Sequence, residues 1–246
     1  MRVVAVYSTK GGVGKTTAAV SLAYEAARDG RVLLWDLDPQ GATTFLLQVK
    51  PKLRDGVGAL ISGKTPLHRA IRATAYERLD VLPADDGYRG LEHLFDAAKK
   101  PTHQIAQVLE RMADDYDVVV LDCPPGSSLV AENAVYAADV VVVPLVPSPL
   151  SLRSLDQVLG VVAESKRPVP VVGFLSMVDR RKSAHRAAVE QLAAHRVEVN
   201  DVVVPASVVV ERMGYELAPI GEYAPRSDAA AAYRALWSRV RAVQPT

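Results

Sequence analysis

Seven short apolar runs, separated by stretches with a helical pattern, constrain the fold of this 246-residue chain most strongly. The runs lie at residues 3–7, 32–35, 79–83, 118–121, 140–144, 169–175 and 202–205. Most of them are continuously apolar, which is typical of strands buried on both faces of a parallel sheet. Helical patterns lie at 16–27, 89–98, 102–113, 128–138, 151–165, 183–195 and 228–242. The alternation predicts an α/β fold, with a mostly parallel twisted sheet flanked by helices on both faces.

Length and composition narrow the possibilities further. The length suits one domain spanning residues 1–246. With 29 Lys+Arg against 28 Asp+Glu, the chain is not a uniformly basic nucleic-acid binder, although a local basic patch remains open. The single cysteine, Cys123, excludes an internal disulfide and fits a reducing compartment. We find no signal-peptide pattern and no apolar run near the roughly 18 residues that span a bilayer, so we expect a cytoplasmic protein.

A glycine-rich segment follows the first apolar run and leads into the first helical stretch. It ends in the Gly-Lys-Thr of a phosphate-binding loop. A strand, a glycine turn and a helix in this order aim backbone N–H groups and a helix N-terminus at phosphate oxygens. We therefore expect the following residues to bind a nucleotide: Lys10, Gly11, Gly12, Val13, Gly14, Lys15, Thr16 and Thr17.

Two features set this loop apart from the ordinary pattern. Thr9 stands where a leading glycine is expected. A second lysine, Lys10, precedes Lys15 by five positions. One lysine is enough to hold the β- and γ-phosphates, so the second is available for a nucleotide bound to another subunit.

Carboxylates follow two other predicted strands. Asp36 and Asp38 follow the second run, and Asp122 follows the fourth. Ligands of parallel sheets bind at the carboxyl ends of the strands, so these side chains are expected near the glycine loop. Asp122 has the form of a Walker B residue, which lies beside Mg²⁺. For Asp38 a turn-forming role before Pro39 remains an alternative, and for Asp36 a purely structural hydrogen bond.

Three motifs together resemble the ParA/MinD family of deviant Walker ATPases, and within it the small, Soj-type ParA partition proteins. They are KGGVGKTT at 10–17, DLDPQG at 36–41 and LDCPPG at 121–126. Two further segments, at 81–84 and 225–227, are similar to family segments, so the resemblance runs the length of the chain. It implies the fold of P-loop NTPases, ATPase activity, and ATP and Mg²⁺ as cofactors.

The resemblance also implies a role for each matching residue. Lys15 would hold the β- and γ-phosphates, with Thr17 near the α-phosphate. The metal set would be Thr16, Asp38 and Asp122, with Asp122 acting through a water molecule. The catalytic set would be Lys10, Lys15 and Asp38, with Asp38 activating the attacking water.

Lys10 would reach across a dimer interface, so that the site is complete only in an ATP-bound homodimer. Hydrolysis would then dismantle that dimer.

The base-binding segment departs from the family pattern. Family members often have Pro-Arg-Asn after the last strand, whereas this chain has Pro205-Ala206-Ser207. We expect Pro205 and Ala206 to hold the base through main-chain groups and apolar packing. The strand end at 176–179 lacks a guanine-reading lysine, which favours ATP over GTP.

The resemblance also implies partners: non-specific double-stranded DNA at the nucleoid, and a ParB-like or other adaptor protein that stimulates hydrolysis. The positions that match the family's DNA-contacting arginines are Arg196 and Arg226. A basic cluster of Arg180, Arg181 and Lys182 either adds to this surface or is a solvated helix face.

Two other functions stay open. A MinD-like protein would bind membranes through an amphipathic last helix, and residues 232–241 contain arginines and Trp237. Leu236 and Val240 are expected to face the core instead, which makes a membrane partner the weaker alternative. A metabolic P-loop ligase would use Lys10 for a small substrate. An iron protein of the nitrogenase type is excluded, because one cysteine cannot supply the two that each subunit needs.

Overall fold

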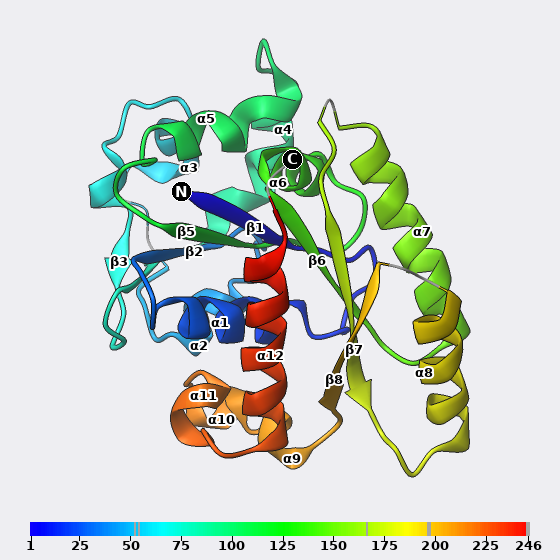
Figure 1. Ribbon diagram of the computed structural model, residues 1–246. Coiled ribbons are helices and arrows are strands. Elements are labelled where there is room, and N and C mark those ends of the chain that lie inside the picture. The colour runs from blue at the N-terminus through cyan, green and yellow to red at the C-terminus, as the bar shows by residue number, and fades with distance from the viewer. Residues whose placement is uncertain (52, 54, 166, 196–197, 245–246) are drawn as a thin grey trace.

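The computed structural model describes residues 1–246 except 52, 54, 166, 196–197 and 245–246. The strands are β1 (Arg2–Val6), β2 (Val32–Asp36), β3 (Arg72–Ala73), β4 (Leu79–Leu82), β5 (Val118–Asp122), β6 (Val140–Leu145), β7 (Val171–Val178) and β8 (Val199–Pro205). They form one sheet in the order β3-β4-β2-β5-β1-β6-β7-β8 (Figure 1). The pairing is parallel throughout except between β3 and β4. The predicted, mostly parallel α/β fold is confirmed.

Long and short helices connect the strands. The longer ones are α1 (Lys15–Ala26), α6 (Leu129–Ala137), α7 (Pro149–Ala163), α8 (Ser183–His195) and α12 (Asp228–Ala242). The shorter ones are α2 (Ala42–Leu46), α3 (Gly56–Ile61), α4 (Leu91–Asp96), α5 (Gln104–Glu110), α9 (Val208–Glu211), α10 (Met213–Glu216) and α11 (Ile220–Tyr223). Single 3-10 turns precede α4 and α5 at Asp86–Gly90 and Pro101–His103, and a third lies at Leu67–Arg69.

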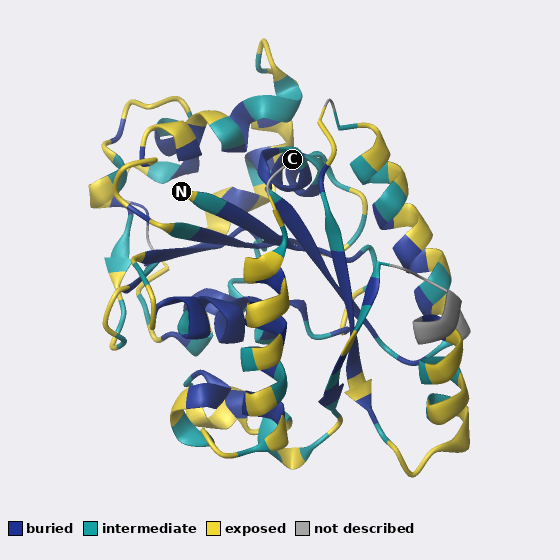
Figure 2. Cartoon of the chain, viewed as in Figure 1, coloured by how far each residue is buried: buried dark blue, intermediate teal, exposed yellow. Residues whose placement is uncertain are grey.

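Helices cover both faces of the sheet, as the apolar runs predict. Because successive side chains of a strand point to opposite faces, β1 sends Val3 and Ala5 into one apolar cluster and Val4 and Val6 into another. The first cluster lies under α3 to α8, and the second under α1 and α10 to α12. The central strands are therefore buried along nearly their whole length (Figure 2).

The last helix packs into the core. Ser227 caps its N-terminus by accepting a hydrogen bond from the Ala230 N–H at 3.2 Å. Its apolar face, with Tyr233, Leu236 and Val240, is almost fully buried beside α1. This face is not available to insert into a lipid surface in the described structure. Within the described ranges, no helix combines the length and the apolar character that crossing a bilayer requires.

The structure adds elements that the sequence pattern does not predict. Strand β3 has only two residues, neither of them buried, so it gives no hydrophobic signal. Helices α9 to α11 have four residues each, which is too short for a helical period to be visible. Strand β7 also continues to Val178, three residues beyond the predicted apolar run.

Candidate functional site

The glycine-rich loop joins β1 to α1 at the carboxyl edge of the sheet. Gly12 and Gly14 have φ angles of 70° and 94°, in the left-handed region that favours glycine. A side chain on Gly14 would also meet the Ser176 hydroxyl of β7 at 3.0 Å. Beside Gly11 and Gly12 there is open space, so the loop presents bare backbone outward. This is the arrangement that lets N–H groups approach an anion closely.

Lys15 begins α1 and lies inside the site. Its side chain is only 7% exposed, and its ammonium donates a hydrogen bond to the carbonyl oxygen of Lys10 at 3.2 Å. Burial lowers the pKa of Lys15, while the nearby Asp122 and Asp38 act in the opposite direction. A buried ammonium held mainly by one neutral carbonyl is suited to receive an anion.

Asp122 ends β5 next to the loop. It is 1% exposed, and its Oδ2 accepts a hydrogen bond from the Thr43 hydroxyl at 2.7 Å. Its Oδ1 is buried without a hydrogen-bond partner among the described residues. Burial raises the pKa of Asp122 to about 6, against the effect of Thr43 and Thr16. An orphaned carboxylate oxygen beside a threonine hydroxyl is the donor set that a hard divalent cation takes.

Asp36 ends β2 opposite Asp122, with which it is in register. Its Oδ2 accepts hydrogen bonds from the Thr44 N–H at 2.8 Å and the Thr44 hydroxyl at 2.7 Å. Its Oδ1 accepts from the Asp38 N–H at 3.3 Å. Burial, and next Asp122, raise the pKa of Asp36 to about 7. Both oxygens are occupied, one by the following loop at Asp38 and the other by Thr44 of α2, which supports the structural role left open for Asp36.

Asp38 lies in that loop and is half-buried. Its Oδ1 accepts a hydrogen bond from the Gln40 N–H at 2.9 Å, so the turn-forming alternative describes a real contact. The same carboxylate is close enough to Lys15 and Asp122 to shift the pKa of both. The predicted residues Lys15, Asp38 and Asp122 are thus brought together at one edge of the sheet.

Helix α7 holds the start of the loop through contacts that the sequence does not indicate. The Thr9 hydroxyl donates to the Gln157 Oε1 at 2.8 Å and lies 3.0 Å from the Ser154 hydroxyl. The Ser154 hydroxyl also lies 3.2 Å from that of Ser8. Thr9 therefore replaces the expected glycine with a side chain that ties the loop to a neighbouring helix.

The segment predicted to hold the base lies at the same edge, beyond β6 and β7. Pro205 ends β8, and the Ala206 N–H donates to the Val178 carbonyl at 3.0 Å. Ser207 caps α9 by accepting a hydrogen bond from the Val210 N–H at 3.4 Å, so its hydroxyl is already engaged in the helix cap. The exposed Ala206 leaves this corner without a long polar side chain.

Comparison with known proteins places the chain in a family. A family model described as an AAA domain matches residues 1–169. The chain is 32% identical to the sporulation initiation inhibitor protein Soj of Bacillus subtilis, covering 98% of each sequence. The chain belongs to the ParA/MinD family of P-loop ATPases. It is 34% identical to the chromosome partitioning protein ParA of Caulobacter vibrioides, covering 85% of this chain and 82% of that one.

A solved structure resembles this ParA/MinD family member along nearly its whole length. It is the cobyrinic acid a,c-diamide synthase of Mycobacterium smegmatis with bound ADP and magnesium. The identity is 28% and the TM-score 0.82, covering 98% of this chain and 94% of the other. The likeness supports the P-loop NTPase fold.

Four of the five basic residues predicted to contact DNA lie in loops of this ParA/MinD family member, at the ends of β7 and α11. Arg180, Lys182 and Arg226 are exposed. Arg181 instead forms a fork with Asp179, from its Nε to Oδ1 at 3.0 Å and from NH2 to Oδ2 at 3.1 Å. This pairing lowers the pKa of Asp179 to about 2 and offsets the charge of Arg181. Arg196 lies outside the described residues.

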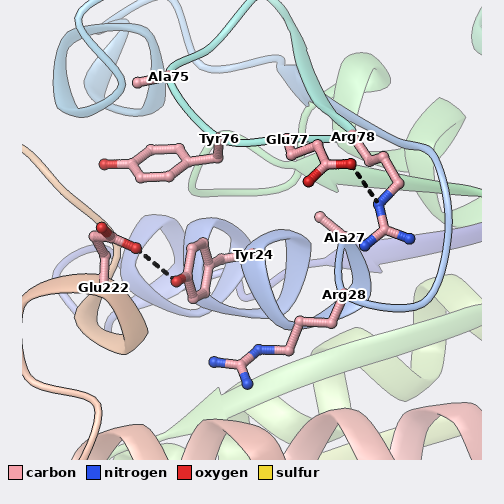
Figure 3. A pocket seen from close by; sticks show the side chains of 8 residues that line it. All are labelled: Tyr24, Ala27, Arg28, Ala75, Tyr76, Glu77, Arg78 and Glu222. Carbon is pink, nitrogen blue, oxygen red and sulfur yellow. Dashed lines mark hydrogen bonds and ion pairs between the residues drawn. The ribbon is translucent and has the colours of Figure 1, made fainter.

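A separate hollow lies outside the candidate nucleotide-binding site. It is lined by Tyr24, Ala27, Arg28, Ala75, Tyr76, Glu77, Arg78 and Glu222 (Figure 3). Tyr24 lies roughly 13 Å along α1 from Lys15, taking 1.5 Å per residue. Its hydroxyl donates to Glu222 at 2.7 Å, which joins α1 to α11. None of the residues predicted to bind a nucleotide lines this hollow.

Proposed function

We propose that this chain is a partition ATPase that binds ATP with Mg²⁺ at the β1–α1 loop. The observation that carries the proposal is the buried Asp122 Oδ1, which has no partner among the described residues and adjoins Lys15 on a phosphate-binding loop. The identities of 32% to Soj and 34% to ParA support partitioning as the purpose of the ATPase.

The residues present fit a magnesium ion. The Thr16 hydroxyl and the Asp122 carboxylate would hold it, with Asp122 acting through water, and Asp38 would lie close by. Bound Mg²⁺ would neutralise charge on the phosphate oxygens. The open space beside Gly11 and Gly12 leaves room for the phosphates themselves.

The chain's own side chains would do the positioning. Lys15 would donate to phosphate oxygens, which compensate a buried ammonium better than the Lys10 carbonyl alone. Asp38 would leave its turn contact with Gln40 to orient the attacking water. Lys10 is half-buried at the opening of the loop, and we propose that it completes the site of a second copy of the chain.

The ATP-bound dimer would bind DNA without sequence preference. Arg180, Lys182, Arg196 and Arg226 are the proposed contacts, and Arg181 contributes less because Asp179 pairs with it. A two-fold dimer doubles the number of phosphate contacts, which compensates for the nearly neutral net charge of +1. A ParB-like partner would stimulate hydrolysis and release the dimer from the nucleoid.

A DNA mobility-shift assay with ATP, with ADP and without nucleotide tests the proposal. We expect a shift with ATP alone, and a weaker one at higher salt because phosphate contacts release counterions. The variant Arg180→Ala with Arg226→Ala should bind ATP normally but lose the shift, whereas the matched control Arg111→Ala should retain it. A DNA shift that is identical in all three nucleotide states would contradict the proposal.

The same nucleotide states should be tested with vesicles of anionic lipid. The burial of Tyr233, Leu236 and Val240 in α12 leads us to expect no binding in any state. Binding to vesicles only with ATP would favour the MinD-like alternative instead.

The structural likeness to the cobyrinic acid a,c-diamide synthase of M. smegmatis favours a ligase as the alternative function. A ligase would consume ATP only with an added carboxylic acid substrate, and its DNA binding would not depend on the nucleotide. Phosphate release from ATP in the presence of DNA, without any small-molecule acid, would exclude this alternative.

A further inference from the structure

Two adjacent threonines of α2 bind the two carboxylates that end β2 and β5. Thr43 donates its hydroxyl to Asp122 Oδ2 at 2.7 Å. Thr44 donates its N–H and hydroxyl to Asp36 Oδ2 and accepts from the Ala84 N–H at 3.0 Å. Thr43 is fully buried and Thr44 nearly so. The two threonines therefore make different connections, one to the candidate metal site and one to the structural carboxylate.

We propose that Thr43 is a positioning residue for the metal site. It orients the Asp122 carboxylate so that Oδ1 is the oxygen left for the hydrated cation, and it links that orientation to the loop that carries Asp38. This inference rests on the proposed function, because it concerns the same site.

The orientation argument follows from burial. A carboxylate at the end of a strand can turn about its last torsion angle, which is broad. One strong hydrogen bond to Oδ2 selects a single orientation, and the partnerless oxygen is then the one left for a ligand. Because Thr43 is 0% exposed, bulk water does not substitute for its hydroxyl when a mutation removes it.

The link to Asp38 follows from the chain. Thr43 follows Asp38 by five positions, beyond the turn that closes with the hydrogen bond from the Gly41 N–H to the Asp38 carbonyl. On the other side of Asp38, the Leu37 N–H donates to the Asp122 carbonyl at 3.0 Å. Asp122 thus contacts the Asp38 loop on both sides, so a shift of α2 would move the carboxylate that holds the cation through water.

The test compares Thr43→Val, Thr43→Ser and Thr44→Val with the wild type. The affinity for a fluorescent ATP analogue is measured with Mg²⁺ and again with EDTA, and Mn²⁺ binding to the nucleotide complex is followed by electron paramagnetic resonance. For Thr43→Val we expect Mn²⁺ affinity to fall by roughly tenfold, because a hydrogen bond to a charged group is lost. Its nucleotide affinity in EDTA should stay unchanged. Thr43→Ser should restore metal binding, because it retains the hydroxyl.

Thr44→Val is the matched control, since it removes the neighbouring hydroxyl and should lower stability while sparing Mn²⁺ affinity. The inference is overturned if Thr43→Val binds Mn²⁺ like the wild type. It is equally overturned if Thr43→Val loses nucleotide affinity in EDTA to the same extent, which would indicate a purely structural role.

Should Thr43→Val not fold, Thr43→Cys supplies the same comparison, because a thiol is a weaker donor of similar size. Intermediate Mn²⁺ affinity supports the inference, and unchanged affinity refutes it. A wild-type chain that binds ATP equally with Mg²⁺ and with EDTA would refute the proposed function itself. That outcome differs from a failure confined to the Thr43 variants.

Discussion

The ammonium of Lys15 donates its hydrogen bond to the carbonyl oxygen of Lys10, 3.2 Å away on the same loop. The two lysines that mark this loop are therefore in direct contact, because the backbone carbonyl of Lys10 accepts a hydrogen bond from the charged ammonium of Lys15. The ammonium has three N–H donors, so those not used by the Lys10 carbonyl are left for phosphate oxygens. The position of the Lys15 ammonium and the backbone at Lys10 are linked through this contact.

Replacing Lys15 with methionine tests the first consequence. We expect the affinity for ATP to fall at least tenfold, because a charge-assisted hydrogen bond is lost while the aliphatic packing is retained. The melting temperature without nucleotide should not fall, since a poorly compensated buried charge has been removed. Isothermal titration and thermal unfolding measure the two quantities, with the exposed Lys64→Met as control. An ATP affinity within twofold of the wild type would show that Lys15 does not hold the phosphates.

Mixing two inactive variants tests whether Lys10 acts in the partner subunit. Lys10→Ala and Asp38→Ala should each hydrolyse ATP poorly alone. In a one-to-one mixture, random two-fold dimers should recover about a quarter of the wild-type rate, because half are mixed and each of these has one complete site. Phosphate release under stimulating conditions measures this. If the mixture stays as slow as the separate variants, Lys10 does not act across the dimer.

Asp38→Ala by itself should separate binding from hydrolysis. We expect ATP to bind with near wild-type affinity, while hydrolysis falls by about a hundredfold or more because the water is no longer oriented. The protein should then accumulate as an ATP-bound dimer on DNA, seen by light scattering and mobility shift. Gln40→Ala is the control, because Gln40 contacts Asp38 through its backbone. Monomeric protein that does not bind DNA under ATP would contradict the assigned role.

The paired carboxylates Asp36 and Asp122 predict a pH dependence of stability. Burial raises the pKa of both above the value of about 3.9 for an unfolded aspartate. At pH values between the unfolded and the folded pKa, the folded protein therefore binds more protons than the unfolded chain. The stabilising effect of these protonated carboxyl groups on the folded state is fully present below about pH 4. It is lost as the pH rises towards about 7. Urea unfolding from pH 5 to 8, without nucleotide, should show the stability falling by a few kcal/mol.

Asp122→Asn provides the control for this effect, because an amide does not titrate. The decrease from pH 5 to 8 should become smaller in this variant than in the wild type. An equal slope in both proteins would show that Asp122 is already ionised across this range.

The sequence predicts the parts of this protein that depend on local pattern. Apolar runs locate the central strands within a few residues, since a strand buried on both faces must be apolar throughout. The rule that ligands bind at the carboxyl ends of strands is enough to predict that Lys15, Asp38 and Asp122 lie together. The short elements β3 and α9 to α11 stay invisible, because two to four residues show no period.

The supporting contacts of the site were not predictable in this way. Thr43 and Asp122 are 79 positions apart, and Thr9 and Ser154 are 145 apart. Which hydroxyl meets which partner depends on how α2 and α7 pack on the sheet, and a single sequence carries no signal for that. A threonine in place of a glycine marks an anomaly at Thr9, but only the fold reveals its partner.

Because the glycine-rich loop is attached to α7, this helix is a suitable site for a fluorescent label that reports on the loop. Thr9 is held by Ser154 and Gln157, and the same helix exposes 61% of Leu150 near its first turn. The chain's own Cys123 is fully buried, and burial raises the pKa of its thiol, so it should react slowly with labels. A thiol-reactive dye would therefore attach mainly to the cysteine of the Leu150→Cys variant. Its fluorescence would report, in real time, any movement of α7 that accompanies nucleotide binding at the loop.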